Sequence, residues 1–147
     1  MMKKYIIFFI CLLSVPMMLL ASPSVAIVKS INGEVSVIHG DKTTSRLKQG
    51  DGLFEKDVIK TVANSSIGII FEDNTLISIG SNAEFLIDEY LFEPEHKNVK
   101  FKSNLFKGKL ACVTGLISKI NPDAMELKVK TATIGIRGTY FVVEAKE

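Results

Sequence analysis

The hydrophobic positions of this chain alternate with polar ones over much of its length. Residues 125–130 (MELKVK) show the clearest case, because three apolar side chains alternate with three charged ones. Successive side chains of a β-strand point to opposite faces, so this pattern predicts a strand with one buried and one solvated face. Residues 33–38 and 99–102 alternate in a similar way and are also predicted to be strands.

Short apolar runs between turn residues predict further strands at residues 57–61, 67–71, 75–79 and 83–92. Asp73 and Asn74 tolerate left-handed backbone angles, and we expect them to form a hairpin turn between two of these runs. Residues 93–98 are polar and contain a proline, so they are predicted to be an exposed loop. Residues 81–86 leave an alternative open, because Ser81 and Asn82 are residue types that cap a short helical turn.

The strands are expected to form an all-β fold. No segment after residue 21 shows a convincing helical period, and short strands separated by glycine-containing turns are typical of all-β domains. Residues 59–69 and 129–136 share a similar sequence pattern, which indicates two similar β-layers. We therefore predict either a compact sandwich or a short solenoid-like arrangement of short strands.

The first 21 residues are typical of a secretory signal peptide. A short basic stretch at residues 1–4 precedes an almost wholly apolar run at residues 5–20, and small residues follow. We expect cleavage after Ala21, with cleavage after Ala26 as the second choice, and a periplasmic or secreted mature chain. Pro16 disfavours a stable membrane helix and thus favours a signal peptide. Membrane contact is expected only if this segment stays uncleaved.

Loss of this segment changes the charge of the chain. The sequence has 18 lysine and arginine residues and 16 acidic residues, and without Lys3 and Lys4 the two classes balance at 16 each. A neutral domain offers no electrostatic basis for nucleic acid binding.

Once the signal peptide is removed, Cys112 is the single cysteine, so it cannot form an internal disulfide. Its apolar neighbours predict that its thiol is buried.

Residues 131–141 (TATIGIRGTYF) combine an apolar, strand-like run with two glycines and one arginine. A buried guanidinium without a partner is unfavourable, so the position of Arg137 needs a physical reason. Arg137 either contacts an anion or a partner, or it pairs with a core acid such as Asp57 or Glu84. Of these two roles we expect the structural one, in which Arg137 pairs with a core acid.

The same segment resembles the sequence that ends the FecR-type domain of bacterial envelope proteins. Further matches follow in order at residues 33–35 (GEV), 50–61 (GDGLFEKDVIKT), 73–75 (DNT), 80–87 (GSNAEFLI) and 108–115 (GKLACVTG). The resemblance covers residues 27–145, which we take as one FecR-like all-β domain. In it the structural motif consists of Thr131, Gly135, Arg137, Gly138, Thr139 and Phe141. We expect the two glycines to mark a bulge or a close approach of two backbones.

The resemblance implies an exported domain that senses or relays a signal through protein contact. Its partner is then an envelope protein or a membrane-bound signalling protein, and Arg137 and Thr139 are the candidate ligand-binding residues. Full-length FecR-type regulators also have a cytoplasmic segment that acts on a sigma factor, followed by a membrane helix. Neither precedes the domain in this sequence, so we do not expect the anti-sigma activity.

No catalytic, metal or cofactor motif is present in the sequence. It lacks a G-x-S-x-G elbow, a glycine-rich phosphate loop and the ligand spacings of zinc or calcium sites. We therefore expect no enzyme, no catalytic residues, no metal and no cofactor. The alternative function is a cell-wall or polysaccharide-associated binding module that uses Tyr90, Phe92 and Tyr140. A small hydrolase built on paired aspartates is a third, weaker alternative.

Overall fold

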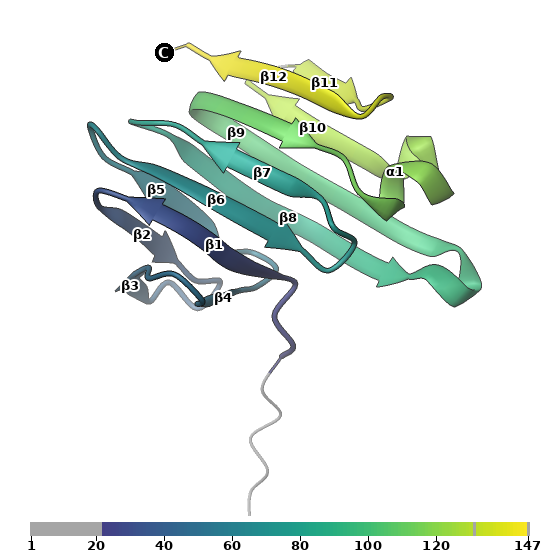
Figure 1. The fold of residues 1–147 in the computed structure, drawn as a ribbon, viewed down its shortest axis with the longest axis horizontal. Coiled ribbons are helices and arrows are strands. Elements are labelled where there is room, and N and C mark those ends of the chain that lie inside the picture. The colour runs from purple at the N-terminus through teal and green to yellow at the C-terminus, as the bar shows by residue number, and fades with distance from the viewer. Residues whose placement is uncertain (1–21, 131, 147) are drawn as a thin grey trace, which may run out of the picture.

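The computed structural model describes residues 22–130 and 132–146. These residues form one curved sheet of twelve strands with very little helix (Figure 1). The all-β prediction is therefore confirmed, and the sheet curls into a half-barrel around its core. The expected signal peptide and Thr131 lie outside the described residues.

The strands of the sheet are mostly short and follow one another closely along the chain. They are β1 (Ala26–Asn32), β2 (Val35–Ile38), β3 (Thr44–Arg46), β4 (Gly52–Leu53), β5 (Val58–Thr61), β6 (Ser66–Phe71), β7 (Leu76–Ile79), β8 (Glu84–Glu93), β9 (Asn98–Val113), β10 (Met125–Val129), β11 (Ala132–Gly135) and β12 (Tyr140–Ala145). One short helix, α1 (Leu116–Ile120), and two single 3₁₀ turns, η1 (Pro94–His96) and η2 (Pro122–Ala124), join them.

The strand β9 organises the sheet. The main path runs in the order β3-β2-β5-β8-β9-β7-β6-β1-β4, and all neighbours along it are antiparallel. The first part of β9 also pairs with β10, which runs parallel to it, and its last part pairs with β12. Gly108 stands where β9 passes from one set of partners to the other. Its φ of +97° favours glycine, and a Cβ there would lie 2.4 Å from the Cβ of Ala83.

The local predictions for turns and strands are largely confirmed. β6 and β7 form the expected hairpin, with Ile70 opposite Leu76 and with Asn74 in the left-handed region at a φ of 66°. Residues 93–98 contain the exposed turn η1. Residues 84–86 belong to β8, so the extended interpretation of that segment holds and the helical alternative is wrong.

The core collects the apolar faces of the alternating strands. Phe71, Tyr90 and Phe101 form an aromatic cluster with ring centroids 4.6 to 5.4 Å apart. Met125 and Leu127 of β10 are buried, as their alternation predicts, and so is the thiol-bearing Cys112. Burial of such large side chains is the main favourable contribution to the stability of the fold.

The expectation of two similar β-layers is wrong. The similar sequences at 59–69 and 129–136 do not occupy similar places, because β10 and β11 pair with each other whereas β5 and β6 pair with different strands. The helix α1 was not expected from the sequence. It has five residues and one buried side chain, that of Ile117, so it is too short to show a helical period.

Candidate functional site

The C-terminal motif does not form one continuous strand, although its apolar run is strand-like. It divides into β11, a turn over residues 136–139, and β12. β11 pairs with β10, whereas β12 pairs with the last part of β9, so the two strands lie in different parts of the sheet. Ile136 in the turn is buried, which anchors this crossing between the two strands.

Arg137 lies on the surface rather than in the core. Its side chain is 77% exposed, and its Nη2 lies 3.0 Å from Oδ1 of Asp123, which is 78% exposed. The expected core partners are engaged elsewhere, because Asp57 bonds to His39 and Glu84 pairs with Lys60. The prediction of a buried structural pair is therefore wrong. An exposed ion pair contributes at most about 1 kcal/mol to stability.

The structure does bring the two candidate ligand-binding residues together. Arg137 and Thr139 line a hollow of about 260 Å³ together with Lys119 of α1. The Thr114 hydroxyl donates a hydrogen bond of 2.7 Å to the carbonyl of Gly138, and its backbone N–H donates to the carbonyl of Thr139. These bonds fix the turn that presents both residues to solvent.

The two motif glycines act differently from what the sequence indicates. A Cβ added at Gly135 or Gly138 would meet no atom within 4 Å, so neither marks a close approach of backbones. Gly138 is required instead by its φ of +126°, which side chains disfavour. Phe141 is half-buried against the core, in register with Cys112.

A row of apolar side chains crosses the outer face of the sheet, beginning at the C-terminal motif. The strand registers place its members opposite one another across five strands: Tyr140 of β12, Val113 of β9, Leu76 of β7, Ile70 of β6 and Ile27 of β1. We call this set the outer row. Its two ends are well exposed, Tyr140 at 64% and Ile27 at 48%. The row presents apolar surface to solvent, which is a common feature of binding faces.

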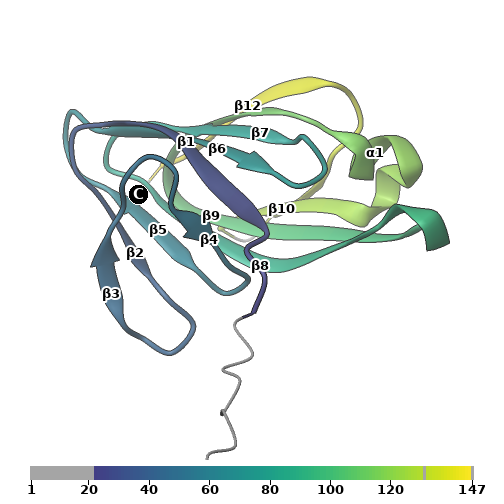
Figure 2. The ribbon, with the colours of Figure 1, turned by 60° about the horizontal axis from the view of Figure 1, so that its bottom comes forward.

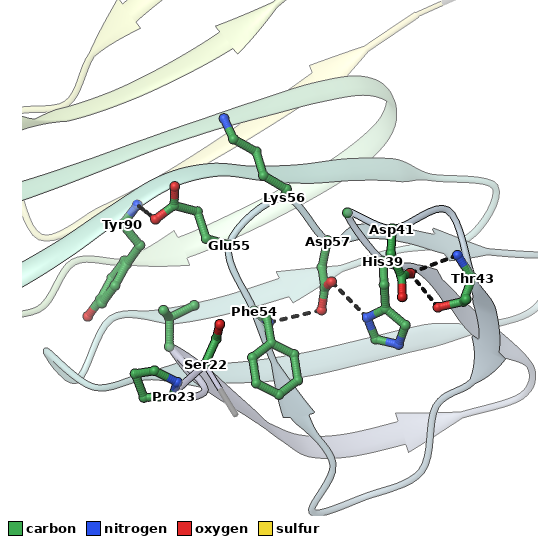
Figure 3. Close-up of a pocket in the computed structure, with 12 residues that line it drawn as sticks. Ser22, Pro23, His39, Asp41, Thr43, Phe54, Glu55, Lys56, Asp57 and Tyr90 are labelled. Carbon is green, nitrogen blue, oxygen red and sulfur yellow. Dashed lines mark hydrogen bonds and ion pairs between the residues drawn. The ribbon is translucent and has the colours of Figure 1, made fainter. Parts of the chain in front are cut away.

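A separate cleft of about 710 Å³ opens beside β2 and β5 (Figure 3). Phe54 and Tyr90 contribute aromatic surface to it, and Asp41 and Glu55 contribute carboxylates. The hydroxyl and the amide of Thr43 donate hydrogen bonds that hold the pKa of the Asp41 carboxyl below its usual range. Lys56 also lines the cleft, but its Nζ lies 2.6 Å from the carboxylate of Asp88.

His39 and Asp57 line one side of this cleft, where their contact joins the end of β2 to the start of β5. Nδ1 of His39 is 2.8 Å from Oδ1 of Asp57, and Oδ2 of Asp57 accepts a hydrogen bond of 2.9 Å from the backbone N–H of Phe54. Asp57 is 1% exposed, whereas the His39 side chain is 29% exposed. Nε2 of His39 lies 3.2 Å from the hydroxyl of Ser45 on β3.

Sequence reasoning missed this cleft. His39 and Asp57 are 18 residues apart, and Ser45 is six residues from His39. No local motif has this spacing, and the three residues meet only because β2, β3 and β5 are neighbours in the sheet. The one indication in the sequence is that Asp57 belongs to residues 50–61, which resemble a FecR-type pattern.

Three further features concern metal ions, membrane helices and sugar-binding aromatic residues in the part of the chain that the structure describes. Its residues include no group of three or more histidine, cysteine or acidic side chains that could hold a metal ion. Nor do they contain a helix that is both long and apolar enough to cross a membrane. Tyr90, one of the three aromatic residues expected to bind sugars, is buried with its hydroxyl on Asp73.

Comparison with known proteins gives one family match and one structural likeness. The family model described as "FecR protein" matches residues 57–147. A comparison with curated protein sequences gives no match. A solved structure titled "Cell surface anchoring domain" has 25% sequence identity and a TM-score of 0.42, over 43% of this chain and 83% of that chain.

Proposed function

This chain belongs to the FecR protein family, and on that basis we propose that it is a protein-binding module of bacterial envelope signalling. FecR domains generally act in envelope signalling together with membrane proteins. The partner that we propose is a single envelope or membrane-bound signalling protein. Such a role needs contact between two proteins and no catalytic step.

The open edge of β12 is the observation that carries this proposal. β12 pairs with β9 on one side, and no other strand among residues 22–130 and 132–146 pairs with it. In Figures 1 and 2 it lies at the margin of the sheet. An edge strand offers free backbone N–H and C=O groups, and a partner strand that pairs with them extends the sheet.

The side chains around this edge favour a protein partner. Tyr140 and Val142 of β12 are 64% and 50% exposed, and Tyr140 begins the outer row. A partner strand with apolar residues on the same face would continue that row. Arg137 and Thr139 stand just before β12, so they are placed to contact the same partner through charge and hydrogen bonds.

The fold also supports one of the two cleavage sites that we proposed for the signal peptide. Ala26 is 2% exposed and begins β1, where it pairs with both Leu53 and Phe71. The backbone of Val25 donates to Leu53 and accepts from Glu72. Cleavage after Ala26 would remove these contacts, whereas cleavage after Ala21 keeps them. We therefore propose an exported chain that begins at Ser22.

Affinity capture from cross-linked cell envelopes tests the binding proposal. Val142→Lys places a charge on the exposed edge of β12 and is expected to abolish recovery of the partner. Val62→Lys is the matched control, because Val62 is exposed to the same degree, 49% against 50%, and lies outside β12. Recovery of one membrane protein with the native chain and the control, but not with Val142→Lys, supports the proposal. Recovery only with sedimented cell wall contradicts it and favours the polysaccharide alternative.

A further inference from the structure

We propose that Ser45, His39 and Asp57 form an acyl-transfer site in which Ser45 is the nucleophile toward uncharged or cationic esters. The site lies beside the cleft and is distinct from the β12 edge. In Figure 1 the β2–β3 pair and the β11–β12 region occupy opposite ends of the sheet. The inference therefore reaches beyond the binding role and does not depend on it.

The distances between the three side chains are those of a nucleophile, a base and a group that positions the base. Oγ of Ser45 is 3.2 Å from Nε2 of His39, and Nδ1 of His39 is 2.8 Å from Oδ1 of Asp57. Such an arrangement is recognised by its geometry and not by the order of residues along the chain. Here the chain order is histidine, serine, aspartate.

An ionised Asp57 selects one tautomer of neutral His39. An ionised carboxylate only accepts hydrogen bonds, so Nδ1 must donate its proton to Asp57. Nε2 is then the acceptor, and the hydroxyl of Ser45 donates to it. That is the tautomer in which a histidine removes a proton from a serine.

Asp57 is held firmly enough to position His39. It is 1% exposed, and its second oxygen accepts the backbone N–H of Phe54. Its carboxylate therefore has a fixed direction, and the imidazole is oriented by it in turn. Ser45 is exposed on the short edge strand β3, where an incoming substrate reaches it.

The sheet register explains why Ser45 meets His39. Ser45 lies opposite Val37 in the β2–β3 pair. His39 follows Val37 by two residues, so it lies on the same face of the ribbon as Ser45. Ser36 lies one residue from Val37 and therefore on the other face, which makes it a natural control serine.

The proposed reaction is an ordinary acyl transfer that needs no oxidant or cofactor. Oγ of Ser45 attacks the ester carbonyl carbon as the hydroxyl proton passes to Nε2 of His39. The ester C–O bond then breaks, and the leaving alcohol takes that proton. Water next attacks the acyl group on Ser45 with His39 again as the base, which releases the carboxylic acid and restores the serine.

His39 lines the cleft and Ser45 stands beside it, so the neighbouring cleft wall limits which esters fit. Phe54 and Val25 give it apolar surface for an acyl group. Asp41 and Glu55 place two carboxylates on its wall, while the nearby ammonium of Lys56 is neutralised by Asp88. A substrate with its own carboxylate is therefore repelled, and a neutral or cationic ester is favoured.

A fluorophosphonate probe tests the proposal with the purified full chain, because it reacts covalently with activated serines. We expect one adduct, mapped to Ser45 by peptide mass spectrometry and absent in Ser45→Ala. His39→Ala should slow labelling by about 100-fold or more, and added imidazole should restore part of it. Asp57→Asn, which removes the positioning charge, should also slow labelling of a protein shown by circular dichroism to be folded.

Ser36→Ala is the matched control and should leave labelling unchanged. Ser45→Ala removes an exposed hydroxyl and its solvent-exposed hydrogen bond to His39, so its melting temperature should stay close to that of the native chain. Absence of an adduct at Ser45, or labelling of Ser36 at the same rate, overturns the proposal. Hydrolysis of p-nitrophenyl acetate that persists in Ser45→Ala does the same.

Discussion

The carboxylate of Asp73 accepts a hydrogen bond of 3.1 Å from the backbone N–H of Ile117, which lies 44 residues further along the chain. Asp73 is fully buried in the β6–β7 turn, and it also accepts hydrogen bonds from Thr75 and from the hydroxyl of Tyr90. One side chain thus joins the turn, α1 and β8. The first turn of α1 is satisfied by this distant residue, since its own N-cap position is a glycine.

Removal of this carboxylate should destabilise the whole domain. Asp73→Ala leaves the hydroxyls of Tyr90 and Thr75 and the backbone N–H groups of Thr75 and Ile117 without their acceptor. We therefore expect a loss of about 3 kcal/mol or more in the free energy of unfolding. Urea denaturation measures it. The control is Asp41→Ala, which removes an exposed turn carboxylate and should leave the midpoint nearly unchanged. Equal midpoints for both variants would contradict the role given to Asp73.

Two glycines that look alike in the sequence should respond differently to alanine. A Cβ at Gly115 would lie 2.1 Å from the backbone carbonyl oxygen of Asp73, whereas one at Gly135 would meet no atom within 4 Å. Gly115→Ala should therefore lower stability by about 2 kcal/mol or more, and Gly135→Ala should be close to neutral. Thermal unfolding followed by circular dichroism compares the pair. The reverse order of melting temperatures would show that the C-terminal motif, and not α1, contains the tight contact.

Arg137→Ala should change binding and not stability. Its ion pair with Asp123 is exposed on both sides, so the free energy of unfolding should fall by less than about 1 kcal/mol. Partner recovery from cross-linked envelopes should decrease, because the guanidinium stands directly before β12. Asp123→Ala, which keeps the guanidinium, should bind as the native chain does. A loss of several kcal/mol in Arg137→Ala would restore the buried structural role that the sequence indicated.

The thiol of Cys112 should be unreactive in the folded protein. Burial, with a smaller contribution from the charge of Asp73, raises its pKa to about 12. At pH 8 the native chain should not react with Ellman's reagent, whereas the unfolded chain in urea should react fully. The protonated thiol favours the folded state at neutral pH. Its contribution to the free energy of unfolding should be lost as the pH rises from about 9 toward about 12. Fast reaction of the native chain would show that the end of β9 opens.

The position of signal-peptide cleavage can be measured directly. Intact mass spectrometry of protein recovered from the envelope fraction should give a chain that begins at Ser22. A chain that begins at Ile27 would lack Val25 and Ala26, and with them the contacts to Leu53 and Phe71. Recovery of that shorter chain in folded form would contradict the proposed cleavage site.

Much of the fold was predictable because it follows from local patterns. The alternation in β10 and the hairpin at Asp73 and Asn74 depend on neighbours within a few residues. The parallel pairing of β10 with β9 was not predictable, because alternation gives the faces of a strand but not its partner. The cap on α1 was hidden for a similar reason, since it joins residues far apart in the sequence.

The candidate sites also divide into residues that a local motif indicates and residues that only the folded sheet brings together. Arg137 and Thr139 could be singled out because they stand in one short motif, although the burial expected for Arg137 is wrong. The outer row could not be predicted from the sequence, because its five members come from five strands. The sequence predicts a core acid as the partner of Arg137, whereas the structure provides Asp123 from the turn η2.

Photo-cross-linking from β12 tests the binding role most directly. Tyr140 is replaced by p-benzoylphenylalanine in living cells, and the same residue at Phe106 serves as a control. Phe106 is also an exposed aromatic position, at 43%, and it lies outside β12. We predict that irradiation joins the Tyr140 variant to one membrane protein and that the Phe106 variant gives no such product. The same products from both positions, or none from Tyr140 while the protein is present in the envelope, would contradict the role of this edge.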